Sequence, residues 1–231
     1  MKLNIISWNI NMFKPDKPEN KVKIINELNK QVNDEDFIIL IESSFGFISD
    51  LLKSEISKKY LLLDNLTLTH GGFINVLYNK NIKNKITNIE LNDLPFSLIK
   101  YTNPKTIYIA GCHLSPFPQN GEVRIQQLMT LRSLIPENEN LVIIGDMNIR
   151  ESETKFMKNK NNALNLIDSG DKRKTWFRSF FEPSQVNISA RFDRLFISPN
   201  LNVDKFDLFG KINNLNLLSD HLAIKVGLRL N

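Results

Sequence analysis

Short apolar runs rich in Ile, Leu and Val recur along the chain, and polar side chains follow many of them. Runs of this length and composition predict buried β-strands. Such runs lie at residues 3–8, 37–41, 73–78, 107–110, 141–144, 191–198, 203–208 and 222–228. Apolar residues at helical spacing predict helices over residues 21–30, 47–58 and 122–135.

Strands outnumber helices in this pattern, and the helices interrupt the strands irregularly. A doubly wound parallel sheet would alternate regularly. We therefore expect an α/β fold in which two mixed β-sheets pack face to face with helices outside. No Pro- or Gly-rich linker and no repeat of fixed period divides the chain, so residues 1–231 are expected to form a single domain. Two irregular loops, Ser115–Gly121 and Glu182–Ser189, are expected to frame a site.

Composition limits the partners and the cellular compartment that we expect. The formal net charge of +5 suits a polyanionic partner, although solubility alone also explains it. Cys112 is the single cysteine and cannot form an internal disulfide, which favours a reducing, intracellular compartment. The first residues turn polar too soon for a signal peptide. Because no apolar run approaches the ~20 residues of a membrane span, we expect no membrane partner.

Two polar residues at strand ends indicate a cation site. Glu42 follows five apolar residues, where a carboxylate is costly unless it is paired or bound to a metal. Asn9 follows the first strand and offers a neutral oxygen. A carboxylate, an amide and several waters are typical ligands of Mg²⁺. The alternative is an ion pair between Glu42 and a neighbouring Lys.

Asp146 and Asn148 follow another buried strand. Residues two apart on an extended segment project to the same side, so this carboxylate and amide can bind a water and a phosphate oxygen together. Gly145 permits a tight departure from the strand. The alternative is an Asx turn that caps the next helix.

Histidines complete the candidate chemistry. A carboxylate near His221 would raise its pKa above the usual ~6.5 and make it a cation at neutral pH. Asp193 is the candidate for that role, and such a pair stabilises charge that develops on a phosphate. The alternative is a structural His that caps a loop. His113 also follows a strand and can contact phosphate, whereas His70 lies in a loop and receives no role.

The order of these motifs resembles the endonuclease/exonuclease/phosphatase superfamily, which contains DNase I. The shared features, over residues 3–230, are Trp8-Asn9, Glu42, His113-Leu114, Gly145-Asp146-Met147-Asn148, Asp193 and Ser219-Asp220-His221. The resemblance implies a DNase I-like four-layer α/β sandwich and a divalent metal, one Mg²⁺ or Mn²⁺ ion.

Within the superfamily, the chain is most similar to the 5′-tyrosyl-DNA phosphodiesterases. The motifs that carry this likeness are Arg124 to Leu128, Gly145 to Arg150 with the later Glu153, Thr175-Trp176, Arg191-Phe192-Asp193-Arg194-Leu195-Phe196, and Phe206 to Gly210. The resemblance implies a monomeric enzyme that cleaves DNA, or RNA, 5′ ends carrying a tyrosyl or peptide adduct.

The resemblance also implies residue roles. Glu42 and Asn9 would hold the metal, Asp220 would tune it from beyond its direct ligands, and Asn9 would also contact the substrate. Asp146 would activate the water. Asn148, His113 and His221 would contact the phosphate, and Asp193 would orient His221. Arg150 and Trp176 would contact the terminal nucleotides, unless Arg150 pairs with Glu151 or Glu153 on the surface and Trp176 is a core aromatic.

The chain departs from the family pattern at several positions. Asn11 stands where an acid is usual, Ile41 replaces a Gln, Ser115-Pro116 replaces Glu-Ser, and Gly72 replaces an aromatic residue. Three other readings stay open: an abasic-site endonuclease or exonuclease, another phosphoesterase of the same fold, and an inactive binding module.

Overall fold

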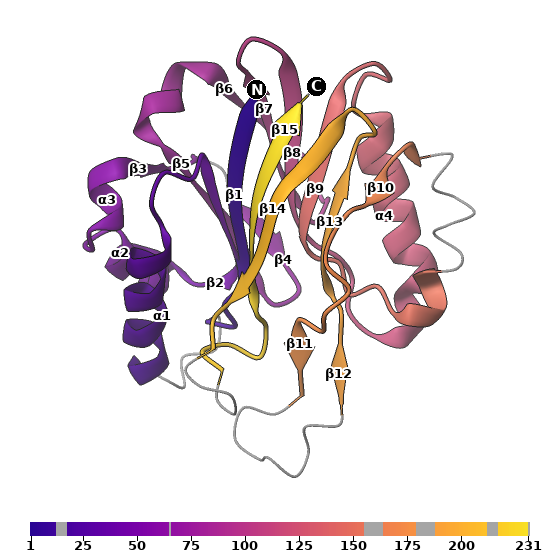
Figure 1. The fold of residues 1–231 in the computed structure, drawn as a ribbon. Coiled ribbons are helices and arrows are strands. Elements are labelled where there is room, and N and C mark those ends of the chain that lie inside the picture. Colours follow the sequence, from indigo (N-terminus) through magenta and orange to yellow (C-terminus); the bar gives the residue numbers. More distant parts are fainter. Residues whose placement is uncertain (13–17, 65, 155–163, 179–187, 212–216, 231) are drawn as a thin grey trace.

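The computed structural model describes residues 1–12, 18–64, 66–154, 164–178, 188–211 and 217–230. Two mixed β-sheets lie face to face in the centre, with helices on both outer sides (Figure 1). The first sheet comprises β1 (Lys2–Asn9), β2 (Phe37–Ser43), β3 (Tyr60–Leu62), β4 (Thr67–Thr69), β5 (Gly72–Asn79), β14 (Leu201–Phe209) and β15 (Ala223–Leu230). The second comprises β6 (Ile86–Ile89), β7 (Phe96–Thr102), β8 (Thr106–His113), β9 (Asn140–Asp146), β10 (Ile167–Asp168) and β13 (Asp193–Ile197).

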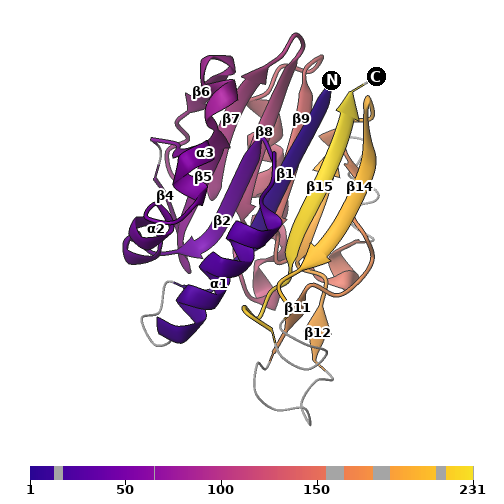
Figure 2. The ribbon, with the colours of Figure 1, turned by 60° about the vertical axis from the view of Figure 1, so that its left-hand side comes forward.

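Helices form the two outer layers. They are α1 (Pro18–Gln31), α2 (Phe45–Leu51), α3 (Ile56–Lys59) and α4 (Gly121–Ser133), with 3₁₀ turns η1 (Lys80–Lys85) and η2 (Pro118–Asn120). Figures 1 and 2 show α1, α2 and α3 against the first sheet, and Figure 1 shows α4 against the second. The four-layer α/β architecture expected from the sequence is therefore confirmed.

Burial on both faces explains why the strands read as continuous apolar runs. In β2, Ile39 and Ile41 face the second sheet, while Ile38 and Leu40 pack under the helices. In β9, Ile144 faces the first sheet, while Ile143 packs under α4. Side chains alternate between the two faces of a strand, so each face must be apolar when both are covered.

Several expected elements differ in detail. The helix expected over 47–58 is divided, because Ser54 donates its backbone N–H (3.0 Å) and its hydroxyl (2.7 Å) to the Leu51 carbonyl and ends α2. Strands β3, β4, β6, β7 and β10 were not expected, nor were the two-residue strands β11 (Trp176–Phe177) and β12 (Ser189–Ala190). In α4, Val123 is exposed and Arg124 is buried, and Leu134, which follows the helix as its C-cap, is also exposed, contrary to the expected apolar face. Residues 182–187 of the second expected loop lie outside the described residues.

The two ends of the sandwich differ. The termini lie side by side at one end, where Met1 donates to the Leu230 carbonyl. At the opposite end, β1, β2, β8 and β9 finish, next to a small ribbon of β11 (Trp176–Phe177) and β12 (Ser189–Ala190) (Figure 2). Among the described residues, no helix has the length and apolar content needed to cross a bilayer.

Candidate active site

The polar residues expected at strand ends meet at one end of the sandwich. The parallel pairs β1–β2 and β8–β9 finish at the same edge of their sheets, with Asn9 in register with Ile41 and His113 with Asp146. The antiparallel strand β13 starts where β9 ends and sets Asp193 opposite Asp146. Asp146 is therefore flanked by His113 and Asp193 on neighbouring strands.

Three side chains form a group that can hold a metal ion. Glu42, His113 and Asp146 each offer one ligand atom, and these atoms lie within 4.8 Å of one another. The His113 Nε2 atom is 3.5 Å from Glu42 Oε1 and 3.7 Å from Asp146 Oδ2. Thr69 Oγ1 lies 2.9 Å from His113 Nδ1 and fixes the ring. The two carboxylates suit a hard divalent cation such as Mg²⁺ or Mn²⁺, whereas an imidazole is a more typical ligand of Zn²⁺, Cu²⁺ or Fe²⁺.

Asn9 links the two acids of this group. Its Nδ2 donates to Glu42 Oε1 at 2.9 Å and to Asp146 Oδ2 at 3.0 Å, while its Oδ1 accepts the Asn11 N–H at 3.1 Å. Burial raises the pKa of Glu42, although His113 and the hydrogen bond from Asn9 act in the opposite direction. Burying the Glu42 carboxylate is thus unfavourable as the side chains stand, which a cation between the acids would offset.

The backbone is bent where it presents these residues. Glu42 has φ of 54° and lies at an irregularity in the β2–β5 pairing between Leu40 and Ser43. Gly145 has φ of 145°, and a Cβ there would lie 2.3 Å from the Cys112 carbonyl oxygen. Positive φ in residues with a side chain costs about 1–3 kcal/mol and often marks a functional site.

His221 lies beside this group as a cation. Its Nδ1 is 2.8 Å from Asp193 Oδ2, and its Nε2 is 3.7 Å from Asp146 Oδ2. Burial acts to lower the pKa of His221, but the carboxylates of Asp193 and Asp146 outweigh it and raise the pKa to about 10. Because Nδ1 is held by Asp193, the Nε2 N–H of this buried imidazolium faces Asp146 and can donate to a phosphate oxygen.

Asn148 forms the turn that the sequence offered as an alternative. Its N–H donates to Asp146 Oδ1 at 3.0 Å, its φ is 50°, and its Nδ2 donates to the Leu114 carbonyl at 3.1 Å. This is an Asx-type turn. It fixes the Asp146 carboxylate, and contact between Asn148 and phosphate stays a prediction.

Arg150, Trp176 and Phe192 form one rim of the site. The Arg150 guanidinium lies over the Phe192 ring, 5.2 Å from its centre, and donates to the Asn148 carbonyl at 2.6 Å. The half-buried Trp176 packs on Phe192 with ring centres 5.2 Å apart. Their contact with nucleotides stays a prediction.

The acids considered as partners of Arg150 are paired elsewhere. Glu153 pairs with Arg124 at 2.6 Å, and Glu151 lies 3.7 Å from Lys174.

Asp220 accepts hydrogen bonds from two side chains outside the group of Glu42, His113 and Asp146. Its Oδ1 accepts from Asn11 Nδ2 at 3.0 Å and its Oδ2 from Trp176 Nε1 at 3.3 Å. The amide at Asn11, where the family usually has an acid, therefore acts as a hydrogen-bond donor to Asp220. Metal ligation by Asp220 stays a prediction.

Sequence reasoning missed three contributors. Thr69 orients His113, Thr175 Oγ1 accepts the Asp193 N–H at 3.0 Å, and Phe192 joins Arg150 to Trp176. Thr175 and Phe192 belong to the motifs Thr175-Trp176 and Arg191-Phe192-Asp193-Arg194, which could have identified them as site residues. Thr69 lies on a three-residue strand that no apolar pattern marked.

A two-sheet α/β sandwich that gathers carboxylates and imidazoles at its strand ends defines a class, the phosphoesterases of the DNase I-like fold. Within that class, the chain belongs to the endonuclease/exonuclease/phosphatase family, whose match covers residues 6–221. Comparison with curated protein sequences gave no match.

Solved structures with the same fold cover almost the whole chain. TDP2 of D. rerio in complex with a single-strand DNA product is 19% identical over 99% of each chain, with a TM-score of 0.73. A truncated TDP2 of Caenorhabditis elegans is 18% identical over 99% of this chain and 98% of that one, with a TM-score of 0.75. The human Nocturnin catalytic domain with bound sulfate is 16% identical over 100% and 94%, with a TM-score of 0.70.

Proposed function

We propose that this protein is a monomeric, one-domain, divalent-metal-dependent phosphodiesterase that removes tyrosyl or peptide adducts from nucleic-acid 5′ ends and leaves a 5′-phosphate. Family membership supports the coarser statement that it is a phosphoesterase. One TDP2 neighbour is bound to a single-strand DNA product, which supports a nucleic-acid substrate. The tyrosyl or peptide adduct is proposed from the motif likeness of the sequence.

One observation carries the proposal. His221, held by Asp193, faces the same Asp146 oxygen that Asn9 and His113 face from the other strands. Side chains that are far apart in sequence thus surround one point with a buried cation, two acids and an amide. This is the arrangement that a phosphate ester needs for attack by water.

The chemistry follows from these positions. A divalent ion held at Glu42, within the group that Glu42, Asp146 and His113 form, would neutralise phosphate charge and stabilise the leaving oxygen. Ligation by Asn9 and contact between His113 and phosphate stay predictions. Asp146 orients the attacking water and takes its proton. Imidazolium His221 donates to a phosphate oxygen, and Asn9 and Asp193 keep the acids and the ring in place. A water oxygen bonds to phosphorus, and the tyrosyl oxygen leaves as a phenolate, a good leaving group with a pKa of ~10.

A panel of DNA ends tests the substrate. The panel compares 5′-phosphotyrosyl, 3′-phosphotyrosyl, abasic-duplex and plain-duplex substrates with Mg²⁺, Mn²⁺ or EDTA. We expect metal-dependent hydrolysis of the 5′-phosphotyrosyl end in preference to the others. Preference for the abasic duplex would replace the proposal with an abasic-site endonuclease, and no hydrolysis of any substrate would favour an inactive binding module.

Two substitutions test the site. Asp146→Asn and His221→Ala should each lower kcat by at least ~10²-fold, because positioned acid–base and electrostatic groups supply that much. His70→Ala is the matched control, since His70 is exposed on a turn. Near-normal turnover in both site variants would refute the assignment.

A further inference from the structure

Exposed apolar side chains gather beside Glu42. Leu68, at 67%, and Phe45, at 63%, are the two most exposed large apolar residues in the described part of the chain. Leu68 on β4 stands opposite Phe73 on β5, and the Phe45 ring packs on the Phe73 ring with centres 4.6 Å apart. We call Phe45, Leu68 and Phe73 the apolar patch. Contiguous exposed apolar surface on a protein marks an interaction site, whereas single exposed residues need no explanation.

The tip of the β4–β5 hairpin joins the apolar patch to the candidate active site. A Cβ on Gly71, at this tip, would lie 2.6 Å from Glu42 Cδ, so the tip packs close to the carboxylate. Phe73, two residues further on, is in register with Ser43, which directly follows Glu42. Gly71 and Gly72 have no side chains that would stand between Glu42 and the patch. A chain that leaves the site at Glu42 can therefore cross the tip and reach the patch.

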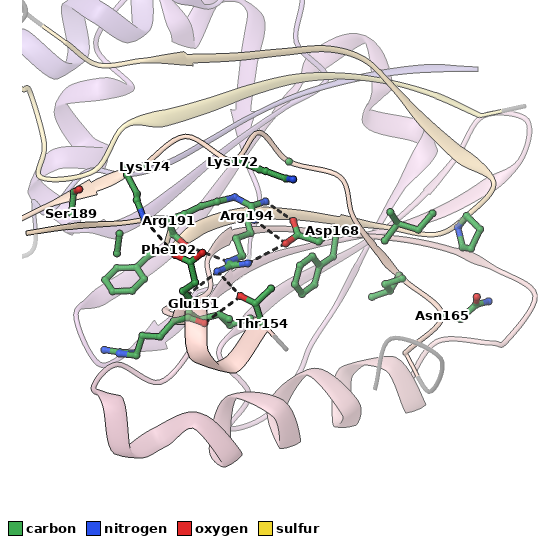
Figure 3. Close-up of a pocket in the computed structure, with 18 residues that line it drawn as sticks. Glu151, Thr154, Asn165, Asp168, Lys172, Lys174, Ser189, Arg191, Phe192 and Arg194 are labelled. Carbon is green, nitrogen blue, oxygen red and sulfur yellow. Dashed lines mark hydrogen bonds and ion pairs between the residues drawn. The ribbon is translucent and has the colours of Figure 1, made fainter. Parts of the chain in front are cut away.

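The segments that carry the apolar patch have no charged residues. Residues 43–48 and 66–74 contain no Lys, Arg, Asp or Glu, and His70 is their one side chain that titrates near neutral pH. A cavity of about 960 Å³ beside β13 differs, since Lys172 and Arg191 are among the cations that line it (Figure 3). A nucleic-acid strand is a polyanion and is attracted to cations. An uncharged apolar surface suits the other part of the proposed substrate, the polypeptide.

We propose that the apolar patch binds the polypeptide part of the substrate, through apolar residues next to the linked tyrosine. The inference rests on the proposed function and deepens it, because peptide side chains then contribute to recognition of the protein-linked end. In the proposed reaction the tyrosyl oxygen leaves beside Glu42, and an extended peptide advances about 3.3 Å per residue. The residues that flank the tyrosine therefore pass over the hairpin tip to Phe45 and Leu68. Contact there removes apolar surface of both partners from water.

Binding in EDTA tests this without catalysis. The probes are single strands of about 12 nucleotides, labelled with fluorescein at the 3′ end, which span a typical single-strand site. They carry at the 5′ end a phosphate, a phosphotyrosine, a phosphotyrosine within a Leu-rich peptide, or a phosphotyrosine within a Gly-Ser peptide. Fluorescence anisotropy gives Kd for each probe. The test variant is Phe45→Gln/Leu68→Gln. The matched control is Val22→Gln/Val123→Gln, which changes apolar side chains 56% and 47% exposed on α1 and α4.

We expect the wild type to bind the probe with the Leu-rich peptide roughly tenfold more tightly than the probe with the Gly-Ser peptide. Tenfold corresponds to about 1.4 kcal/mol, in line with burial of part of two apolar side chains. The test variant should lose this preference and the control should keep it. Because Phe45 and Leu68 are exposed, the test variant should unfold at nearly the wild-type Tm. An equal preference in the two double variants would overturn the proposal.

Two other occupants of the apolar patch give different results. Weaker binding of the plain 5′-phosphorylated strand by the test variant would contradict the proposal, in favour of contact with the strand itself. A wild-type dimer in analytical ultracentrifugation that the test variant converts to a monomer would also contradict it, in favour of a second copy of this chain.

The binding result is separate from the activity panel. If the preference depends on Phe45 and Leu68 while 5′-phosphotyrosyl ends resist hydrolysis, the patch assignment holds and the proposed reaction fails. If those ends are hydrolysed while both double variants keep the preference, the reaction holds and the patch assignment fails.

Discussion

The ion pair of Arg124 with Glu153 offers a sharp test of how the site is supported. Arg124 is fully buried on α4, and its Nε and Nη2 donate to the two oxygens of Glu153 at 3.0 and 2.6 Å. Its Nη1 donates to the carbonyls of Ser115 at 2.7 Å and Phe117 at 2.8 Å. One guanidinium thus ties the loop after His113 to the helical turn after Asn148.

The cost of Glu153→Ala can be worked from this geometry. Removing one partner of a buried pair leaves an uncompensated charge and costs about 3–5 kcal/mol. Arg124 keeps its two carbonyl acceptors, which favours the lower end, about 3 kcal/mol. For a chain of 150–250 residues, each kcal/mol lowers Tm by about 2–4 °C, so we expect a fall of about 6–12 °C.

Thermal unfolding by circular dichroism measures this fall. The control is Glu151→Ala on the same helical turn, whose side chain is 92% exposed and which should change stability by less than about 0.5 kcal/mol. Arg124→Met should cost less in the Glu153→Ala background than in the wild type, because the two residues are coupled. A Tm for Glu153→Ala within about 2 °C of the wild type would refute the reasoning.

Three further predictions follow from Glu42, Gly145 and Cys112. Glu42→Gln should raise the Mg²⁺ concentration for half-maximal activity by at least about tenfold, and an unchanged metal titration would remove Glu42 from the ligand set. Gly145→Ala should destabilise the protein by more than about 3 kcal/mol in chemical denaturation, since its Cβ would lie 2.3 Å from a carbonyl oxygen at φ of 145°; wild-type stability would contradict this. Burial raises the pKa of the Cys112 thiol, so a thiol reagent should modify the protein only in denaturant, and rapid modification of the folded protein would count against it.

The superfamily motifs predicted some of the site residues but not all of the contacts that hold them. Gly-Asp-Met-Asn marked Asp146 correctly as a strand-end residue, whereas His221 of Ser-Asp-His lies two residues before β15 begins. The structure sets His221 Nε2 3.7 Å from Asp146 Oδ2. The motif containing Arg124 and Gln127 was also recognised in the sequence, but the contacts that these side chains make could not be predicted. Gln127 accepts the Ser115 N–H at 3.2 Å and donates to the Ser115 hydroxyl at 2.9 Å, so one helix face holds the loop after His113.

Other features of the structure could not be predicted from the pattern of apolar and polar residues. The strand holding Thr69 has three residues, too few for periodicity to register. Arg124 occupies a position that helical spacing assigned to the surface, because its charge is satisfied only by Glu153 and by the loop carbonyls. A cavity beside β13 is lined by Arg150, Lys172 and Arg191, which lie in different segments of the chain, so no local rule predicts that they are close together.

The sequence by itself determined the main apolar strands, the faces they bury and the polar residues at their ends, because side-chain alternation and burial are local consequences of residue type. Only the tertiary structure decided which of those ends meet. Strand order, register and the packing of the two sheets place Asp146 between His113 and Asp193. They also bring Arg191 and Arg194 into hydrogen-bond contact with Asp168, and Asn11 into contact with Asp220. These are pairings between distant segments, and their energies depend on mutual burial that no single segment contains.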